Sequence, residues 1–198
     1  MKKVLAVMFA AALVLAAGSD LMAAKKLAPK LIVGFEKDTD ISELFKENNG
    51  DKTYPVEKVT ENVTEGKYAC KISFPKDGDW PGPHFLKFDG NWTGYDVLKI
   101  DVFNPTKEVV SLNFAAIDDK SKITKEAYFG EYGLRYHAST VLKPGKNTFE
   151  IEIAGATVED KSRALDIGNV KKFSVFVSSR PADFVIYIDN IRVEQVSE

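Results

Sequence analysis

The segment Asp96–Phe103, which reads DVLKIDVF, decides the fold class of this chain. Leu98, Ile100 and Val102 occupy alternate positions, with polar residues between them, and Asn104-Pro105 follows immediately. Side chains of a β-strand point to opposite faces at successive positions, so this pattern predicts a strand with one buried face. Proline cannot donate to a strand ladder, so the strand is expected to end there.

The same two-residue period recurs along most of the chain. It predicts further strands at Lys30–Glu36, Val56–Val63, Lys67–Phe74, Pro83–Phe88, Val109–Ile117, Arg135–Leu142, Thr148–Ile153, Phe173–Ser178 and Phe184–Val193. One short helix is predicted at Asp40–Asn48, and the strongest turn at Lys143–Asn147. The fold class is therefore all-β: a two-sheet antiparallel β-sandwich (jelly roll) with one or two short helical turns.

The N-terminus has the features of an export signal. Lys2 and Lys3 precede an uninterrupted apolar run, Val4–Ala17, and small residues follow it. The run is short for a membrane span, although an uncleaved anchor is the alternative. We expect a signal peptide at 1–24, a linker at 25–30 and one β-sandwich domain at 31–198. The mature protein is then secreted or periplasmic, with no membrane insertion after signal cleavage.

Composition narrows the classes of partner. The 198 residues include 27 basic and 29 acidic side chains, which gives a net charge of −2 and no electrostatic reason to expect nucleic acid. Cys70 is the only cysteine and alternates with apolar residues, so it is expected to be a buried, unbridged side chain. We expect a monomer.

Several motifs follow one another in a recognisable order. They are Gly34-Phe35-Glu36, ENVTEGKYACKI at 61–72, WTGYDVLKIDV at 92–102, Lys143-Pro144-Gly145, and YIDNIRV at 187–193. This series resembles the galactose-binding-like β-sandwich domains, which include carbohydrate-binding modules of bacterial glycoside hydrolases. The resemblance implies a non-catalytic domain whose partner is a polysaccharide or oligosaccharide. Fold alone does not settle function, because some members of that superfamily bind no glycan.

The resemblance also implies one structural calcium ion (Ca2+). Its ligands would be Glu36, Glu61 and Asp189, with Glu65 as a substitute for Glu61. Calcium takes six to eight oxygen ligands, and such a site would join the two ends of the domain. The alternative is that Glu36 and Asp189 only cap strand ends through hydrogen bonds.

The candidate ligand-binding residues are aromatic and basic side chains in or beside loops. Exposed rings offer platforms to the C–H faces of sugars, and polar side chains bind the hydroxyls. Trp80 lies in a Gly/Pro-rich loop, whereas Trp92 is expected to be structural. If Leu142 faces the core, its strand points Arg135 and His137 outward. The predicted site comprises Trp80, His84, Tyr128, Tyr132, Arg135 and His137; the alternative is a loop that packs its own aromatics over the core.

Catalysis is not expected. Glu150 and Glu152 project from one face of a strand, as the acids of some glycosidases do, but the alternation around them predicts a solvated outer face. Neither histidine has a catalytic or metal-ligand partner at a diagnostic spacing. Two other classes stay open: an extracytoplasmic protein-interaction or envelope-structural sandwich without a sugar site, and a small lyase or glycosidase.

Overall fold

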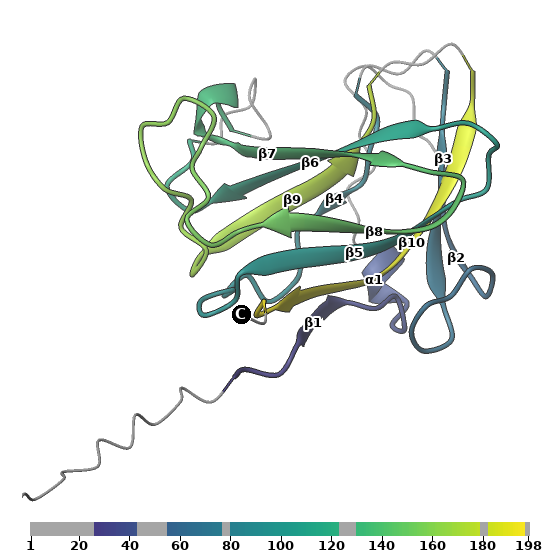
Figure 1. The fold of residues 1–198 in the computed structure, drawn as a ribbon, viewed down its shortest axis with the longest axis horizontal. Coiled ribbons are helices and arrows are strands. Elements are labelled where there is room, and N and C mark those ends of the chain that lie inside the picture. The colour runs from purple at the N-terminus through teal and green to yellow at the C-terminus, as the bar shows by residue number, and fades with distance from the viewer. Residues whose placement is uncertain (1–25, 43–54, 77–79, 123–129, 179–181, 197–198) are drawn as a thin grey trace, which may run out of the picture.

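The computed structural model describes residues 26–42, 55–76, 80–122, 130–178 and 182–196. Their strands form two antiparallel sheets that pack as the two layers of a sandwich (Figure 1). The six-stranded sheet has the order β2-β3-β10-β5-β8, and β1 also pairs with β10. Its strands are β1 (Lys30–Val33), β2 (Val56–Val59), β3 (Ala69–Phe74), β5 (Val97–Asn104), β8 (Gly145–Glu152) and β10 (Phe184–Glu194).

The second sheet has four strands in the order β4-β9-β6-β7. They are β4 (His84–Phe85), β6 (Val110–Asp118), β7 (Tyr136–Leu142) and β9 (Val170–Phe176). The all-β sandwich predicted from the alternating pattern is thus confirmed. Every predicted strand is present, and the differences lie at the ends of the strands.

Two of those differences have a clear local cause. The strand expected to reach Glu36 ends at Val33, because Phe35 adopts a left-handed conformation (φ 59°) and turns its ring into the core. Strand β8 starts at Gly145, inside the expected turn, because the side chain of Asn147 closes that turn with hydrogen bonds to Lys143. The helix α1 spans Thr39–Ser42, and the rest of the predicted helix lies outside the described residues.

The core lies between the sheets and is rich in aromatic side chains. Trp92 is fully buried, donates its indole N–H to the carbonyl oxygen of Asp89, and packs edge-on against Phe173. The ring of Phe173 also stacks on Phe85, with ring centroids 4.4 Å apart. Cys70 is buried among these apolar residues. The structural roles predicted for Trp92 and Cys70 are confirmed.

A buried ion pair holds the loops at one end of the four-stranded sheet. Asp118, at the end of β6, is fully buried and receives both terminal nitrogens of Arg163, with Nη2 at 2.9 Å from Oδ1. It also accepts hydrogen bonds from the backbone N–H groups of Lys120 and Asp166. Ser121 links this network to the chain before β7 by donating to the carbonyl oxygen of Leu134. The short 3-10 helix η1 (Tyr132–Leu134) is thereby positioned beside the sheet.

Within the described residues, no helix is both long and apolar enough to cross a membrane. The predicted signal peptide lies outside those residues.

Candidate functional site

The four-stranded sheet turns one set of side chains away from the core. Phe114, Ala116, Phe173 and Val175 face inward and belong to the core cluster, so the alternate positions on the same strands point outward. These outward positions, called the outer face below, include His84, Asn113, Ala115, Ile117, His137, Ser139, Lys172, Ser174 and Phe176, with Arg135 next to the start of β7.

One row of the outer face crosses all four strands. His84 on β4 is paired with Ser174 on β9, Ser174 with Ala115 on β6, and Ala115 with His137 on β7. The two histidines therefore occupy the two edges of the same row, with small side chains between them. A neighbouring row contains Phe176, Asn113 and Ser139.

Trp80 contacts this second row from the chain just before β4. Its ring meets that of Phe176 edge-on, with centroids 6.0 Å apart, while 59% of its surface stays exposed. The backbone of Trp80 is in the left-handed region (φ 54°), which is uncommon for a bulky residue and is often found at functional sites. The next residues pack tightly, because a Cβ on Gly82 would collide with the carbonyl oxygen of Val175. The chain thus presents an indole ring beside the outer face.

A second aromatic ring lies at the opposite edge, over β7. Tyr132 is 62% exposed, and its ring lies 4.8 Å from that of His137. The guanidinium of Arg135 lies 5.8 Å from the Tyr132 ring and donates two hydrogen bonds to the carbonyl oxygen of Gly130. These contacts hold the segment before β7 against the sheet.

Basic groups gather between these two aromatic positions. Lys172 is only 4% exposed although it carries an ammonium group, and it lies opposite Ile117 in the register. Burial, followed by the nearby Arg135 charge, lowers the pKa of Lys172 to about 8. Burial and the charges of Lys172 and Arg135 lower the pKa of His84 to about 4. The pKa of His137 is also lowered, chiefly by burial.

Two polar atoms of the outer face, one on β9 and one on the edge strand β7, are buried and have no hydrogen-bond partner. The hydroxyl of Ser174 is one of them, in a residue that is 3% exposed. The other is Nδ1 of His137, which lies 3.5 Å from a carboxylate oxygen of Glu159. Burial lowers the pKa of His137, and Glu159 acts in the opposite direction. Buried polar atoms are almost always satisfied in proteins, so these two are exceptions.

Five of the six predicted ligand-binding residues meet at this face: Trp80, His84, Tyr132, Arg135 and His137. Tyr128 lies outside the described residues. Sequence reasoning missed Asn113, Lys172, Ser174 and Phe176, which come from β6 and β9. The alternation of 172–176 already separates Lys172, Ser174 and Phe176 from the core positions, but only the strand order reveals that they join the predicted residues.

The three carboxylates of the expected calcium site each accept hydrogen bonds from other groups of the protein. Glu36 accepts hydrogen bonds from the backbone N–H groups of Lys67 and Tyr68, and the first of these contributes most to the lowered pKa of Glu36. Asp189 is buried and accepts from the N–H groups of Thr64 and Glu65. The carboxylate of Glu61 receives the hydroxyl of Tyr187.

As they lie, the carboxylates of Glu36 and Asp189 cap backbone amides. No group of three or more His, Cys, Asp or Glu side chains suited to a metal occurs in the part of the chain that the structure describes. Calcium binding therefore remains a prediction from the resemblance.

The glutamates considered for catalysis lie on the other sheet. Glu150 and Glu152 are exposed on β8, and Glu150 forms an ion pair with Lys99 at 3.2 Å. Their prediction as solvated side chains is confirmed.

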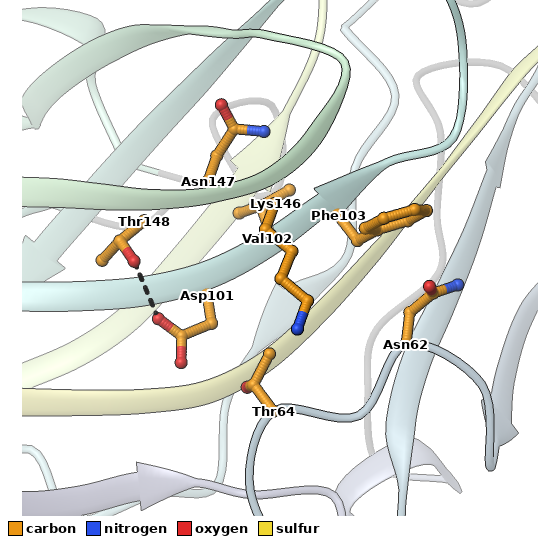
Figure 2. A pocket seen from close by; sticks show the side chains of 8 residues that line it. All are labelled: Asn62, Thr64, Asp101, Val102, Phe103, Lys146, Asn147 and Thr148. Atoms are coloured by element: carbon orange, nitrogen blue, oxygen red, sulfur yellow. Dashed lines mark hydrogen bonds between the residues drawn. The ribbon is translucent and has the colours of Figure 1, made fainter.

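A pocket of about 320 Å³ also opens on the outside of the six-stranded sheet (Figure 2). Its lining comprises Asn62, Thr64, Asp101, Val102, Phe103, Lys146, Asn147 and Thr148. Asp101 is already bonded to Thr148 and Asn190 and paired with Arg192, and Asn147 closes its own turn. We place the candidate site on the outer face, because five of the predicted ligand-binding residues meet there and none of them lines this pocket.

The sequence matches no model of a protein family and no curated protein. Solved structures do match. A family 11 carbohydrate-binding module from Clostridium thermocellum, in complex with a β-1,3-1,4-mixed-linked tetrasaccharide, has a TM-score of 0.65 at 15% identity, over 87% of this chain and 99% of that one. The family 11 module of a cellulosomal cellulase from the same organism gives 0.62 at 15% identity, over 87% and 97%.

An exo-β-agarase also matches, with a TM-score of 0.62 at 16% identity, over 85% of this chain but only 25% of the agarase. The fold of this protein is therefore that of the β-sandwich carbohydrate-binding modules. The resemblance seen in the order of the motifs is confirmed at the level of the fold.

Proposed function

We propose that this protein is a carbohydrate-binding domain that does no chemistry, and that it binds an oligosaccharide or polysaccharide on the outer face of the four-stranded sheet. One observation carries the proposal: residues chosen from the sequence as sugar-binding candidates come from β4, β7 and two separate loops, and they meet on one face. The alternative was a loop that packs its own aromatics over the core. That alternative explains neither the left-handed backbone of Trp80 nor the rows of polar side chains between Trp80 and Tyr132.

The physical basis is the combination of rings and polar atoms. Trp80 and Tyr132 are exposed near opposite edges of the sheet and can pack against the C–H faces of sugar rings. Asn113 and Ser139 lie between them and offer donors and acceptors to hydroxyl groups. Ligand sites typically have a small number of well-placed polar groups between apolar surfaces.

The comparisons support the same class of function. Two matched structures are carbohydrate-binding modules, and one was solved with a bound tetrasaccharide. The chain spans nearly all of both modules, so the fold that it shares with them extends over each module as a whole.

Location and assembly belong to the proposal as well. The protein acts outside the cytoplasm, as a secreted or periplasmic monomer, after removal of the N-terminal segment. N-terminal sequencing of the mature protein should give a start between Ser19 and Lys25, whereas a mature protein that begins at Met1 would contradict export.

A glycan array followed by calorimetric titration tests the function. We expect saturable binding of at least one oligosaccharide class by the mature domain. No binding across a broad set of neutral and acidic glycans would favour the protein-interaction or envelope-structural alternative.

A further inference from the structure

The outside of the six-stranded sheet carries an aromatic pair among charged side chains. The inward positions of β5 belong to the core, so Lys99, Asp101 and Phe103 point outward. Lys99 and Asp101 form ion pairs, as is usual on a solvated sheet face. Phe103 instead lies opposite Tyr187 of β10, and their rings meet edge-on with centroids 6.1 Å apart. The ring of Phe103 thereby gives the pocket on this sheet an apolar wall.

Two polar side chains of the pocket are not used by the protein. Lys146 lies opposite Phe103 on β8, and Figure 2 shows it extending across β5 toward Thr64, in the loop between β2 and β3. Its ammonium group has no ion-pair or hydrogen-bond partner among the residues that the structure describes. The side-chain amide of Asn62, in the same loop, has none there either. A ligand in the pocket can therefore bind both groups without breaking a contact of the protein.

A fixed carboxylate and hydroxyl lie on the other side of Lys146. Asp101 accepts from the hydroxyl of Thr148 at 3.1 Å and from the amide of Asn190 at 3.0 Å, and it pairs with Arg192 at 3.1 Å. Thr148 gives its only hydroxyl proton to Asp101, so toward a ligand its oxygen acts as an acceptor. Because Arg192 balances the charge of Asp101, that carboxylate does not occupy Lys146.

This set of groups fits a neutral ligand with several hydroxyl groups. A hydroxyl both donates and accepts, and the pocket offers donors on Lys146 and Asn62 and acceptors on Asn62 and Thr148. An anionic ligand would meet the carboxylate of Asp101, and a cationic one would meet Lys146. The ring of Phe103 offers a surface for the C–H face of a sugar. A sugar residue satisfies all of these groups at once.

The size of the pocket limits how much sugar it can hold. Ligand pockets have volumes of about 300–1,000 Å³, and this one, at about 320 Å³, is small. We infer that it is a second sugar site, which binds a single neutral sugar residue through Phe103, Lys146 and Asn62. Two sources supply such a residue: a free monosaccharide and the end of a glycan chain. The inference goes beyond the proposed function and does not depend on it, because the pocket shares no residue with the outer face.

Nuclear magnetic resonance titration of the isotope-labelled mature protein tests the inference, because it detects and locates weak binding. A monosaccharide has about twelve non-hydrogen atoms, so we expect a Kd on the order of 1 mM. The panel is glucose, galactose, mannose and xylose, each beside a disaccharide that ends in the same sugar. At least one sugar should give saturable shifts of the amides of Asn62, Phe103 and Lys146, and these shifts should persist in Trp80→Ala. Binding of the monosaccharide alone identifies a free sugar, and binding of both identifies a chain end.

Substitutions around the pocket provide matched controls. Lys146→Met should raise the Kd about tenfold or more, and Asn62→Gly should raise it severalfold, because each removes a hydrogen-bonding group. Asn62 has a left-handed backbone (φ 54°), so glycine removes the amide and keeps the conformation. Lys143→Met changes an exposed lysine of the same turn that does not line the pocket, and it should leave the Kd unchanged. Thermal unfolding of each variant verifies that it folds.

The outcomes separate the inference from the proposed function. The inference is overturned by shifts confined to the four-stranded sheet, by pocket shifts that keep their Kd in both Lys146→Met and Asn62→Gly, or by no shifts with any sugar of the panel. None of these results removes glycan binding by the outer face, which the array tests. Pocket binding in a protein that fails on the array would keep this inference and overturn the proposed function of the outer face.

Discussion

His84 and His137 lie at the two ends of one row that crosses the four-stranded sheet, joined by the pairings with Ser174 and Ala115. Neighbouring strands are 4.7–4.9 Å apart, so three strand spacings place the two histidines about 14 Å apart. A face of this width is broader than one sugar ring. The row therefore favours a chain of sugar residues over a monosaccharide as the ligand.

The ion pair of Asp118 and Arg163 should be essential for stability. Burial by itself raises the pKa of Asp118, but hydrogen bonds from Arg163 and two backbone amides outweigh it and lower the pKa. Arg163→Met leaves a buried carboxylate without its cation and should cost about 3–5 kcal/mol in the free energy of unfolding. Denaturant unfolding measures it. A loss below about 1 kcal/mol would show that the pair contributes little.

Acid should weaken the same network. The pKa of Asp118 is lower in the folded state than in the unfolded state. The stability that Asp118 contributes is therefore fully present above its unfolded pKa and is lost as the pH falls through its folded pKa. The double variant Asp118→Asn, Arg163→Met should therefore lose less stability on acidification than the wild type.

Lys172 should behave in the opposite way to a stabilising lysine. Its pKa of about 8, against an ordinary 10.5, corresponds to ~3 kcal/mol of penalty on the charged form. The unfolded chain holds this proton up to higher pH, so the contribution of Lys172 to stability rises between about pH 8 and 10. Lys172→Met should match or exceed the wild-type stability at pH 7 and should lack this rise. A clear loss of stability at pH 7 would instead assign Lys172 a structural role.

Calcium should raise the melting temperature if the predicted site forms. A ligand bound only by the folded state adds ~2.7 kcal/mol at a hundredfold excess over its Kd. Melting in calcium and in EDTA measures the difference, and Asp189→Ala should abolish it. Equal midpoints for the wild type would remove the calcium prediction and leave Glu36 and Asp189 as caps of the backbone amides they contact.

Polysaccharide cleavage should be undetectable. Glu150 is paired with Lys99 on the six-stranded sheet, and its exposed neighbour Glu152 shares that face, away from the candidate site. Assays for reducing ends and for unsaturated products cover hydrolysis and elimination. Activity that disappears in Glu150→Gln or Glu152→Gln would show that the domain is an enzyme.

Alternation of apolar residues was sufficient to predict the strands, because each strand has one face in the core. It made the outward orientation of Arg135 and His137 depend on whether Leu142 faces the core, and Leu142 is buried in the structure. It could not bring Lys172 and Ser174 to the same face, since that depends on β9 pairing with both β4 and β6. The left-handed conformation of Trp80 was also hidden, because bulky residues rarely adopt it and no local pattern indicates it.

The central claim is that a glycan binds on the outer face of the four-stranded sheet, beside Trp80. Calorimetric titration of the best array ligand into the wild type, Trp80→Ala and Phe103→Ala tests it directly. Phe103 is the matched control, because it is an aromatic residue lining the pocket on the opposite sheet. Burial of one aromatic side chain is worth about 1.5–3 kcal/mol, so Trp80→Ala should weaken binding by about tenfold to a hundredfold, with little change in melting temperature. Phe103→Ala should leave the affinity unchanged. Affinity that survives in Trp80→Ala and falls in Phe103→Ala would contradict the account and move the site to the other sheet.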